Sequence, residues 1–276
     1  MKIEDLLQRV VDEGASDGFV SAGAPPGIKV DGNIFPMADE PLTSEEAREL
    51  VLSTMDEEQQ AYFFEHHEYN FAIGREGLGR FRVSCFQQRG EYGLVLRRIV
   101  TEIPTIDELG LPPIVKELSM TKRGLVIFVG ATGTGKSTSL ASMVGYRNEN
   151  SRGHIITIED PIEYVHPHVG CLVTQREVGV DTYSWENALK NTLRQAPDVI
   201  QIGEVRTSET MKSAIVFAET GHLVLATLHA NNANQALDRI NHFFAADRHS
   251  QLWMDLSLNL RGIVAQQLVP TIDGKS

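Results

Sequence analysis

Apolar residues run directly into a glycine-rich turn at Val126-Ile127-Phe128-Val129-Gly130-Ala131-Thr132-Gly133-Thr134-Gly135-Lys136-Ser137-Thr138. The turn matches the pattern G-x-x-x-x-G-K-[ST], and further apolar residues follow it at helical spacing. The stretch therefore predicts a strand, a phosphate-binding loop and a helix, in that order. Glycines let backbone N–H groups approach phosphate oxygens, and the start of a helix adds a partial positive charge.

All nine residues of this loop are predicted to contact a nucleotide: Gly130, Ala131, Thr132, Gly133, Thr134, Gly135, Lys136, Ser137 and Thr138. Lys136 is expected to reach the β- and γ-phosphates, and the hydroxyl of Ser137 is expected to bind Mg²⁺. The predicted cofactors are therefore ATP or ADP together with Mg²⁺.

A second motif, Thr157-Ile158-Glu159-Asp160-Pro161-Ile162-Glu163, places three carboxylates after an apolar strand. Pro161 interrupts regular structure, so the acids are expected at the carboxyl end of the strand, where doubly wound sheets bind ligands. We expect Glu163 to orient the attacking water, with Glu159 and Asp160 near the metal. A solvated acidic turn without a role in chemistry is the alternative.

A third motif is the apolar run Asp198-Val199-Ile200-Gln201-Ile202-Gly203-Glu204, which ends in an acid. A P-loop ATPase needs a second acidic element of this kind, so Glu204 is expected to hold Mg²⁺ directly or through water. Gly203 replaces the more usual apolar residue before the acid, and it is expected to allow a close approach of backbone.

A fourth motif is Gly221-His222-Leu223-Val224-Leu225-Ala226-Thr227-Leu228-His229, an apolar strand between two histidines. His229 follows the carboxyl end of the strand, so it is expected on the same side as the phosphate loop, where it could sense the γ-phosphate. His222 enters the strand at the opposite end, which argues against a direct role. A structural histidine is the alternative for either residue.

The order of predicted elements indicates an α/β protein of two domains. Residues 1–100 mix helices and strands in an α+β arrangement, residues 101–113 form a proline-containing linker, and residues 114–276 alternate strand and helix as a RecA-like P-loop domain does. Near-continuous apolar strands predict a parallel sheet in the second domain. The predicted helices are 1–14, a helix that starts at Thr43, 57–66, 185–194, 208–219 and 234–243. The predicted strands are 19–20, 28–30, 33–35, 69–73, 79–86, 93–99, 124–129, 154–158, 199–202, 223–227 and 263–269.

The composition limits the classes of protein. Among 276 residues the net charge is −12, which argues against a general nucleic-acid binder. Only Cys85 and Cys171 are present, without metal-binding spacing. The acidic N-terminus does not resemble a signal peptide, and no apolar run approaches the roughly 20 residues needed to span a bilayer. We expect a cytoplasmic protein that inserts no segment into the membrane and reaches it through a partner.

The four motifs, in this order, resemble those of the secretion-ATPase superfamily, which includes the motors of type II secretion and of type IV pili (PilT/PilU and GspE-like proteins). The resemblance covers essentially the whole chain and is strongest to the pilus retraction branch. Three stretches resemble its PilU-type accessory motors: 120–126, 174–179 and 228–239.

The resemblance implies a PAS-like N-terminal domain, a RecA-like C-terminal domain and a homo-hexameric ring. It also implies ATP hydrolysis that powers or assists pilus retraction in twitching motility. The implied partners are a PilT-like motor ATPase and the inner-membrane platform protein of the pilus, so the chain would lie peripheral to the inner membrane.

The arginines of the family's N-terminal domain correspond to Arg82 and Arg97, and the resemblance implies that they act at the nucleotide site. Arg194 and Arg239 are further candidates near the ring interface. Arg80 shares one strand face with Arg82. Fixed cations near a γ-phosphate stabilise its charge as arginine fingers do, although surface arginines of a strand are the alternative.

Two departures from the family pattern carry expectations. Gly18 stands where retraction ATPases commonly have an apolar residue, so the first strand is expected to be loosened. The chain ends at Ser276, soon after the predicted strand 263–269, whereas relatives continue. The ATPase domain is therefore expected to be truncated at its C-terminus, with weakened ring assembly or force transmission.

Three other functions compete with a motor. A nucleotide-binding adaptor would turn over slowly and act through a PilT-like motor. A RecA-like DNA translocase fits the core but not the net charge. A pilus-extension or type II secretion ATPase is disfavoured by the short N-terminal region and by the absence of a four-cysteine zinc insertion.

Overall fold

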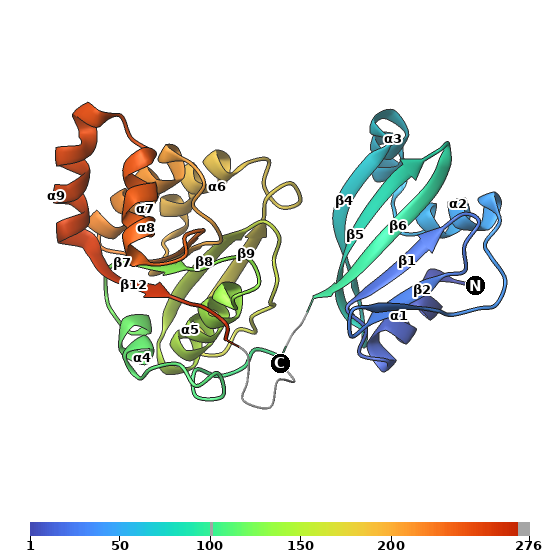
Figure 1. Cartoon of the computed structure of the whole chain (residues 1–276), viewed down its shortest axis with the longest axis horizontal. Coiled ribbons are helices and arrows are strands. Elements are labelled where there is room, and N and C mark those ends of the chain that lie inside the picture. Colours follow the sequence, from blue (N-terminus) through green and yellow to red (C-terminus); the bar gives the residue numbers. More distant parts are fainter. Residues whose placement is uncertain (100–101, 270–276) are drawn as a thin grey trace. The chain divides into compact units, whose positions relative to one another are not determined.

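The computed structural model describes residues 1–99 and 102–269, and it divides into two units, Met1–Thr101 and Glu102–Ser276 (Figure 1). Each unit has its own six-stranded sheet and its own buried core.

The sheet of the first unit is antiparallel throughout, with the strand order β3-β2-β1-β6-β5-β4. Three helices pack on it: α1 on β1 and β2, α2 on β1 and β6, and α3 on β4. Alternation along β5 buries Phe81 and Val83 on one face and leaves Arg80 and Arg82 on the other. The elements are α1 Ile3–Asp12, β1 Asp17–Ser21, β2 Gly27–Val30, β3 Asn33–Pro36, α2 Ser44–Leu52, α3 Glu57–His66, β4 Glu68–Arg75, β5 Gly79–Gln88 and β6 Glu91–Ile99.

Gly18 lies inside β1, which pairs with β2 and β6 over the residues around it. A Cβ atom at this position would lie 3.1 Å from Cγ2 of Val10 and 3.3 Å from Cδ1 of Leu6. The glycine therefore lets α1 pack closely against the strand. The expectation of a loosened strand is wrong, because the missing side chain is replaced by side chains of the helix.

The sheet of the second unit is parallel throughout, as predicted, with the strand order β12-β7-β11-β10-β8-β9. Its central strands β7, β10 and β11 are buried at every residue, which explains their near-continuous apolar sequence. The strands are β7 Gly124–Val129, β8 Gly153–Glu159, β9 Cys171–Glu177, β10 Val199–Ile202, β11 Leu223–Leu228 and β12 Leu260–Ala265.

Alternation along β7 directs its side chains into two cores, one on each face of the sheet. Val126 and Phe128 pack with side chains of α4 and α5, whereas Leu125 and Ile127 pack with those of α6, α7, α8 and α9. Figure 1 shows these helices around the second sheet. Their bounds are α4 Ile114–Ser119, α5 Lys136–Asn150, α6 Trp185–Thr192, α7 Ser208–Glu219, α8 Ala233–His242 and α9 His249–Asn259, with 3₁₀ turns at Leu193–Gln195 and Ala246–Arg248.

The structure differs from the predicted elements at several places in the second unit. The helix predicted over 185–194 ends at Thr192 and continues as a 3₁₀ turn, and the strand predicted over 263–269 is β12, three residues earlier at its start. Helices α4 and α9 and strand β9 were not predicted. Within the predicted linker 101–113, Ile106 is buried in the core beneath α5, and residues 106–110 form a turn. Residue 100 of the predicted first domain, residue 101 of the predicted linker and residues 270–276 lie outside the described part of the chain.

None of the helices in residues 1–99 and 102–269 combines the length and the apolar character needed to cross a membrane.

Candidate functional site

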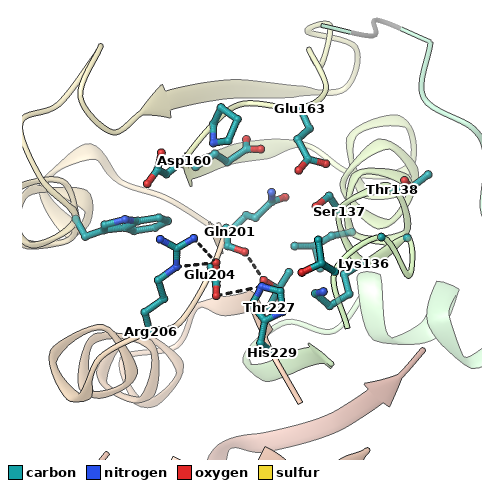
Figure 2. A pocket seen from close by; sticks show the side chains of 18 residues that line it. Lys136, Ser137, Thr138, Asp160, Glu163, Gln201, Glu204, Arg206, Thr227 and His229 are labelled. Carbon is teal, nitrogen blue, oxygen red and sulfur yellow. Dashed lines mark hydrogen bonds and ion pairs between the residues drawn. The ribbon is translucent and has the colours of Figure 1, made fainter. Parts of the chain in front are cut away.

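A cavity of about 380 Å³ lies at the carboxyl ends of β8, β10 and β11, beside the start of α5 (Figure 2). Because these strands are parallel, their carboxyl ends meet at one edge of the sheet. The cavity contains residues from all four sequence motifs. Its lining consists of Thr132, Gly133, Gly135, Lys136, Ser137, Thr138, Leu140, Glu159, Asp160, Pro161, Glu163, Trp185, Gln201, Gly203, Glu204, Arg206, Thr227 and His229.

The glycine-rich loop adopts a backbone that only glycine accommodates well. Gly133 and Gly135 have φ of 81° and 82°, in the left-handed region. A Cβ atom on Gly130 would collide with Thr134 and would lie 2.6 Å from the carbonyl oxygen of Gln266. Of the nine predicted loop residues, Gly130, Ala131 and Thr134 do not line the cavity. Thr134 instead closes the loop, its Oγ1 donating to the Ala131 carbonyl at 2.8 Å.

Lys136 is the first residue of α5, and its side chain is buried against the loop. Its Nζ donates hydrogen bonds to the carbonyl oxygens of Gly130 (3.0 Å) and Ala131 (2.8 Å). Burial lowers the pKa of Lys136, while the negative charges of Glu204 and Glu163 raise it. Because carbonyl groups are neutral, these bonds hold the ammonium group in place without cancelling its charge, which suits it to bind an anion.

The acidic turn after β8 provides two kinds of carboxylate. Glu159 is buried, and its Oε1 accepts hydrogen bonds from Thr157 Oγ1 (2.6 Å) and Gln175 Nε2 (3.2 Å). Burial raises the pKa of Glu159 to about 7, although the bonds from Thr157 and Gln175 lower it. Asp160 and Glu163 are exposed, and Figure 2 shows the Glu163 carboxylate directed toward Ser137.

Glu204 follows β10 and has two basic neighbours. Its Oε2 accepts a hydrogen bond from Nε of Arg206 (2.7 Å) and lies 2.6 Å from Nη2 of the same arginine, with which it forms an ion pair. Its Oε1 lies 3.3 Å from Nε2 of His229 (Figure 2). The structure thus brings the third and fourth motifs into direct contact. His229 lies after β11, which pairs with β10 along its length.

Gly203 directly follows β10 and lies close to the end of β8. Its N–H donates to the Ile158 carbonyl at 2.8 Å, and a Cβ atom would lie 3.1 Å from that oxygen and 3.2 Å from Cα of Glu159. The expected close approach of backbone is confirmed. Thr227 Oγ1 donates to the Gly203 carbonyl from the other side, so the backbone before Glu204 is held by both neighbouring strands.

The predicted arginines belong to other parts of the chain. Arg82 and Arg97 lie in the first unit, where they are cross-strand neighbours in β5 and β6. Arg97 is committed to a local ion pair, because its Nε lies 2.8 Å from Oδ1 of the buried Asp17. In the second unit, Arg194 is exposed after α6, and Arg239 of α8 lies over the ring of Phe243.

Sequence reasoning missed several residues of the cavity. Arg206 had a usable signal: it lies two residues after Glu204 in a non-helical segment, so the two side chains can point the same way. No sequence signal marked Trp185, Gln201 and Thr227, because their positions in the cavity depend on how the strands and helices are arranged. The contact of Tyr164 with Thr138, 2.9 Å between the hydroxyl oxygens, also joins segments whose proximity the spacing does not reveal.

The chemistry of the donors suits Mg²⁺. Ser137, Glu159, Asp160 and Glu204, the four predicted metal-binding residues, all line this cavity and offer oxygen atoms. Across the described residues no group of three or more acidic, histidine or cysteine side chains is arranged as a metal site. Mg²⁺ in nucleotide sites is usually held by one or two protein carboxylates together with phosphate oxygens of the nucleotide.

Comparisons with known proteins identify the family of the chain. Residues 66–276 match the family described as Type II/IV secretion system protein. The chain is 68% identical over 275 residues to the type IV pilus ATPase PilU of Pseudomonas aeruginosa, covering 100% of this chain and 72% of that protein. It is 42% identical to the type IV pilus retraction ATPase PilT of the same organism, covering 99% of this chain and 80% of that protein. The crystal structure of the pilus retraction motor PilT with bound ADP superimposes with a TM-score of 0.94 at 45% identity, covering 99% of this chain and 80% of that chain.

Proposed function

The chain belongs to the type II/IV secretion system protein family, and we propose that it is an ATP-hydrolysing motor or accessory motor subunit that powers type IV pilus retraction in twitching motility. The observation that carries this proposal is the convergence of Lys136, Glu163, Glu204 and His229 on one cavity next to the glycine-rich loop. Lys136 provides a cation that hydrogen bonds hold in place, and Glu163 and Glu204 come after β8 and β10, which are neighbouring strands of the same sheet.

Each residue of the cavity has a chemical task in this proposal. Loop N–H groups and the Lys136 ammonium bind the β- and γ-phosphates, and Glu163 orients the attacking water. Ser137 and Glu204 hold Mg²⁺, with Asp160 and the remaining oxygen of Glu159 beside it. When bound, Mg²⁺ neutralises phosphate charge. His229, in contact with Glu204, is placed to couple the state of the γ-phosphate to that carboxylate.

The wider assembly is also part of the proposal. The first unit is PAS-like, the second unit is RecA-like, and six copies form a ring. The protein acts in the cytoplasm, at the inner membrane, with a PilT-like motor and the pilus platform protein. The antiparallel and parallel sheets and the name of the PilT relative support these points.

The test is steady-state ATP hydrolysis by the wild type and by Lys136→Ala, measured as phosphate release. We expect the variant to lose hydrolysis and to bind ADP weakly, because the cation that contacts the phosphates is gone. Lys122→Ala is the matched control, since Lys122 is an exposed lysine of the same unit that does not line the cavity. Unchanged turnover in Lys136→Ala would contradict the proposal.

The same assay separates a motor from an adaptor. If the chain hydrolyses ATP independently, the rate of a mixture with a PilT-like motor should equal the sum of the two separate rates. Hydrolysis that remains at background for the chain alone, together with intact ADP binding, would favour the adaptor.

A further inference from the structure

Gln201 is a polar residue at a position of β10 where its neighbours are apolar. Ile200 and Ile202 point into the core on one face of the sheet, and Val199 into the core on the other. By alternation Gln201 shares the face of Val199, the face covered by α5. Its side chain therefore replaces an apolar residue beneath the helix that begins with the phosphate loop.

The side chain of Gln201 is 5% exposed, and its Oε1 has no hydrogen-bond partner. A buried carbonyl oxygen without a partner loses its bonds to water and gains nothing in return, which lowers stability. The same side chain lines the nucleotide cavity, and Figure 2 shows its amide directed into the cavity in the region between Glu204 and Ser137. The missing partner is therefore expected to come from the ligand side.

The chemistry of the ligand restricts what that partner is. An amide oxygen accepts hydrogen bonds, and ionised phosphate oxygens have none to donate. Water bound to a cation donates strongly, and Mg²⁺ in nucleotide sites usually keeps several water molecules. Ser137 and Glu204, the residues assigned to Mg²⁺, line the same cavity.

We propose that Gln201 is a positioning residue for the metal–nucleotide complex, and that its Oε1 accepts a hydrogen bond from a water molecule bound to Mg²⁺. This inference rests on the proposed function as a Mg²⁺-dependent ATPase. It explains why an amide with an unpartnered oxygen occupies the apolar face of a central strand: the residue lowers the stability of the nucleotide-free protein and strengthens the bound state.

Gln201→Met tests this, because methionine has a similar length and lacks the amide. ADP affinity is measured by calorimetry in Mg²⁺ and in EDTA, and the melting temperature is measured without nucleotide. We expect the variant to lose about tenfold of the affinity that Mg²⁺ adds, because a water-mediated hydrogen bond is nearly as good as a direct one. Its affinity in EDTA should equal that of the wild type, and its melting temperature should rise by about 2–4 °C.

Ile202→Val is the matched control, because Ile202 is on the same strand but packs on the opposite face. It should lower the melting temperature and keep the full effect of Mg²⁺. Gln201→Leu provides a second apolar replacement with the same expected signs.

Two results would overturn the inference. A Gln201→Met protein that keeps the wild-type gain in ADP affinity from Mg²⁺ would contradict the inference on Gln201 and leave the proposed function intact. A variant that melts at a lower temperature and binds ADP equally weakly in Mg²⁺ and EDTA would show that Gln201 serves packing. A wild type whose ADP affinity is the same in Mg²⁺ and EDTA would contradict the metal dependence in the proposed function as well.

Discussion

Arg206 contacts a single oxygen of Glu204 through two nitrogens, because Nε lies 2.7 Å and Nη2 2.6 Å from Oε2. The carboxylate is mostly buried, with 15% of its side chain exposed, whereas the arginine is 57% exposed. The other oxygen of Glu204 is left facing His229. Arg206 thus sets the orientation of the carboxylate that is assigned to Mg²⁺.

We expect Arg206→Gln to lower kcat by roughly tenfold or more, since loss of a group that orients a metal ligand typically has an effect of this size. The kcat of Arg206→Lys should fall between those of the wild type and Arg206→Gln, because an ammonium group keeps the charge but cannot reproduce the planar fork of a guanidinium. Steady-state ATP hydrolysis measures both, with Lys122→Gln as the control for loss of a surface cation. Wild-type turnover in Arg206→Gln would show that Glu204 needs no such orientation.

Gly203→Ala should destabilise the second unit by about 1–3 kcal/mol, the usual cost of inserting a methyl group into a closely packed place. The new Cβ would press on backbone atoms of Ile158 and Glu159, which cannot rotate away. Urea unfolding followed by tryptophan fluorescence measures this unit, because Trp185 and Trp253 both lie in it.

Gly145→Ala is the control for the same substitution. Gly145 lies within α5, and a Cβ there would meet only Cγ2 of Ile103, at 3.9 Å. Alanine favours a helix over glycine by up to about 1 kcal/mol, so this variant should be more stable. Equal effects of the two substitutions would refute the role assigned to the β8–β10 contact.

Glu159→Gln should change the dependence of stability on pH. Burial raises the pKa of Glu159 from 4.5 to about 7, so between these pH values the folded protein keeps a proton that the unfolded chain releases. Stability from this group is present below pH 4.5 and is lost as the pH rises through 7, by roughly 3 kcal/mol. The glutamine variant should match the wild type at pH 5 and be more stable at pH 8. Equal differences at both pH values, in urea unfolding, would contradict the raised pKa.

Arg97→Gln should destabilise the first unit by about 1–3 kcal/mol, because the buried carboxylate of Asp17 would lose a charged partner. Hydrogen–deuterium exchange of peptides from β1 and β6 measures the effect locally. Arg82→Gln is the comparison, and the double variant Asp17→Asn/Arg97→Gln should recover slow exchange. Fast exchange in Arg82→Gln, together with wild-type exchange in Arg97→Gln, would contradict the structural role of Arg97.

Gly18 and Gly203 show how far sequence reasoning reached. Both glycines stand where the pattern favours an apolar residue. Gly18 lies in β1, which pairs with strands on both sides, and Gly203 directly follows β10, with its backbone hydrogen-bonded on both sides. For Gly203 the expected close approach is confirmed, because a neighbouring strand is the natural contact at that position. For Gly18 the expectation was wrong, because the contact is with α1, and the spacing along the chain does not show which helix packs there.

The chain's own sequence determined the phosphate loop, the strands that lead into each motif and the parallel character of the second sheet. These features depend on local patterns: glycines with positive φ, continuous apolar strands, and acids at strand ends. Only the tertiary structure decided that His229 contacts Glu204, that Oε1 of Gln201 is buried beside the cavity without a hydrogen-bond partner, and that Arg97 pairs with Asp17. The physical reason is that strand order and helix packing bring these atoms together, and neither follows from the distance between residues along the chain.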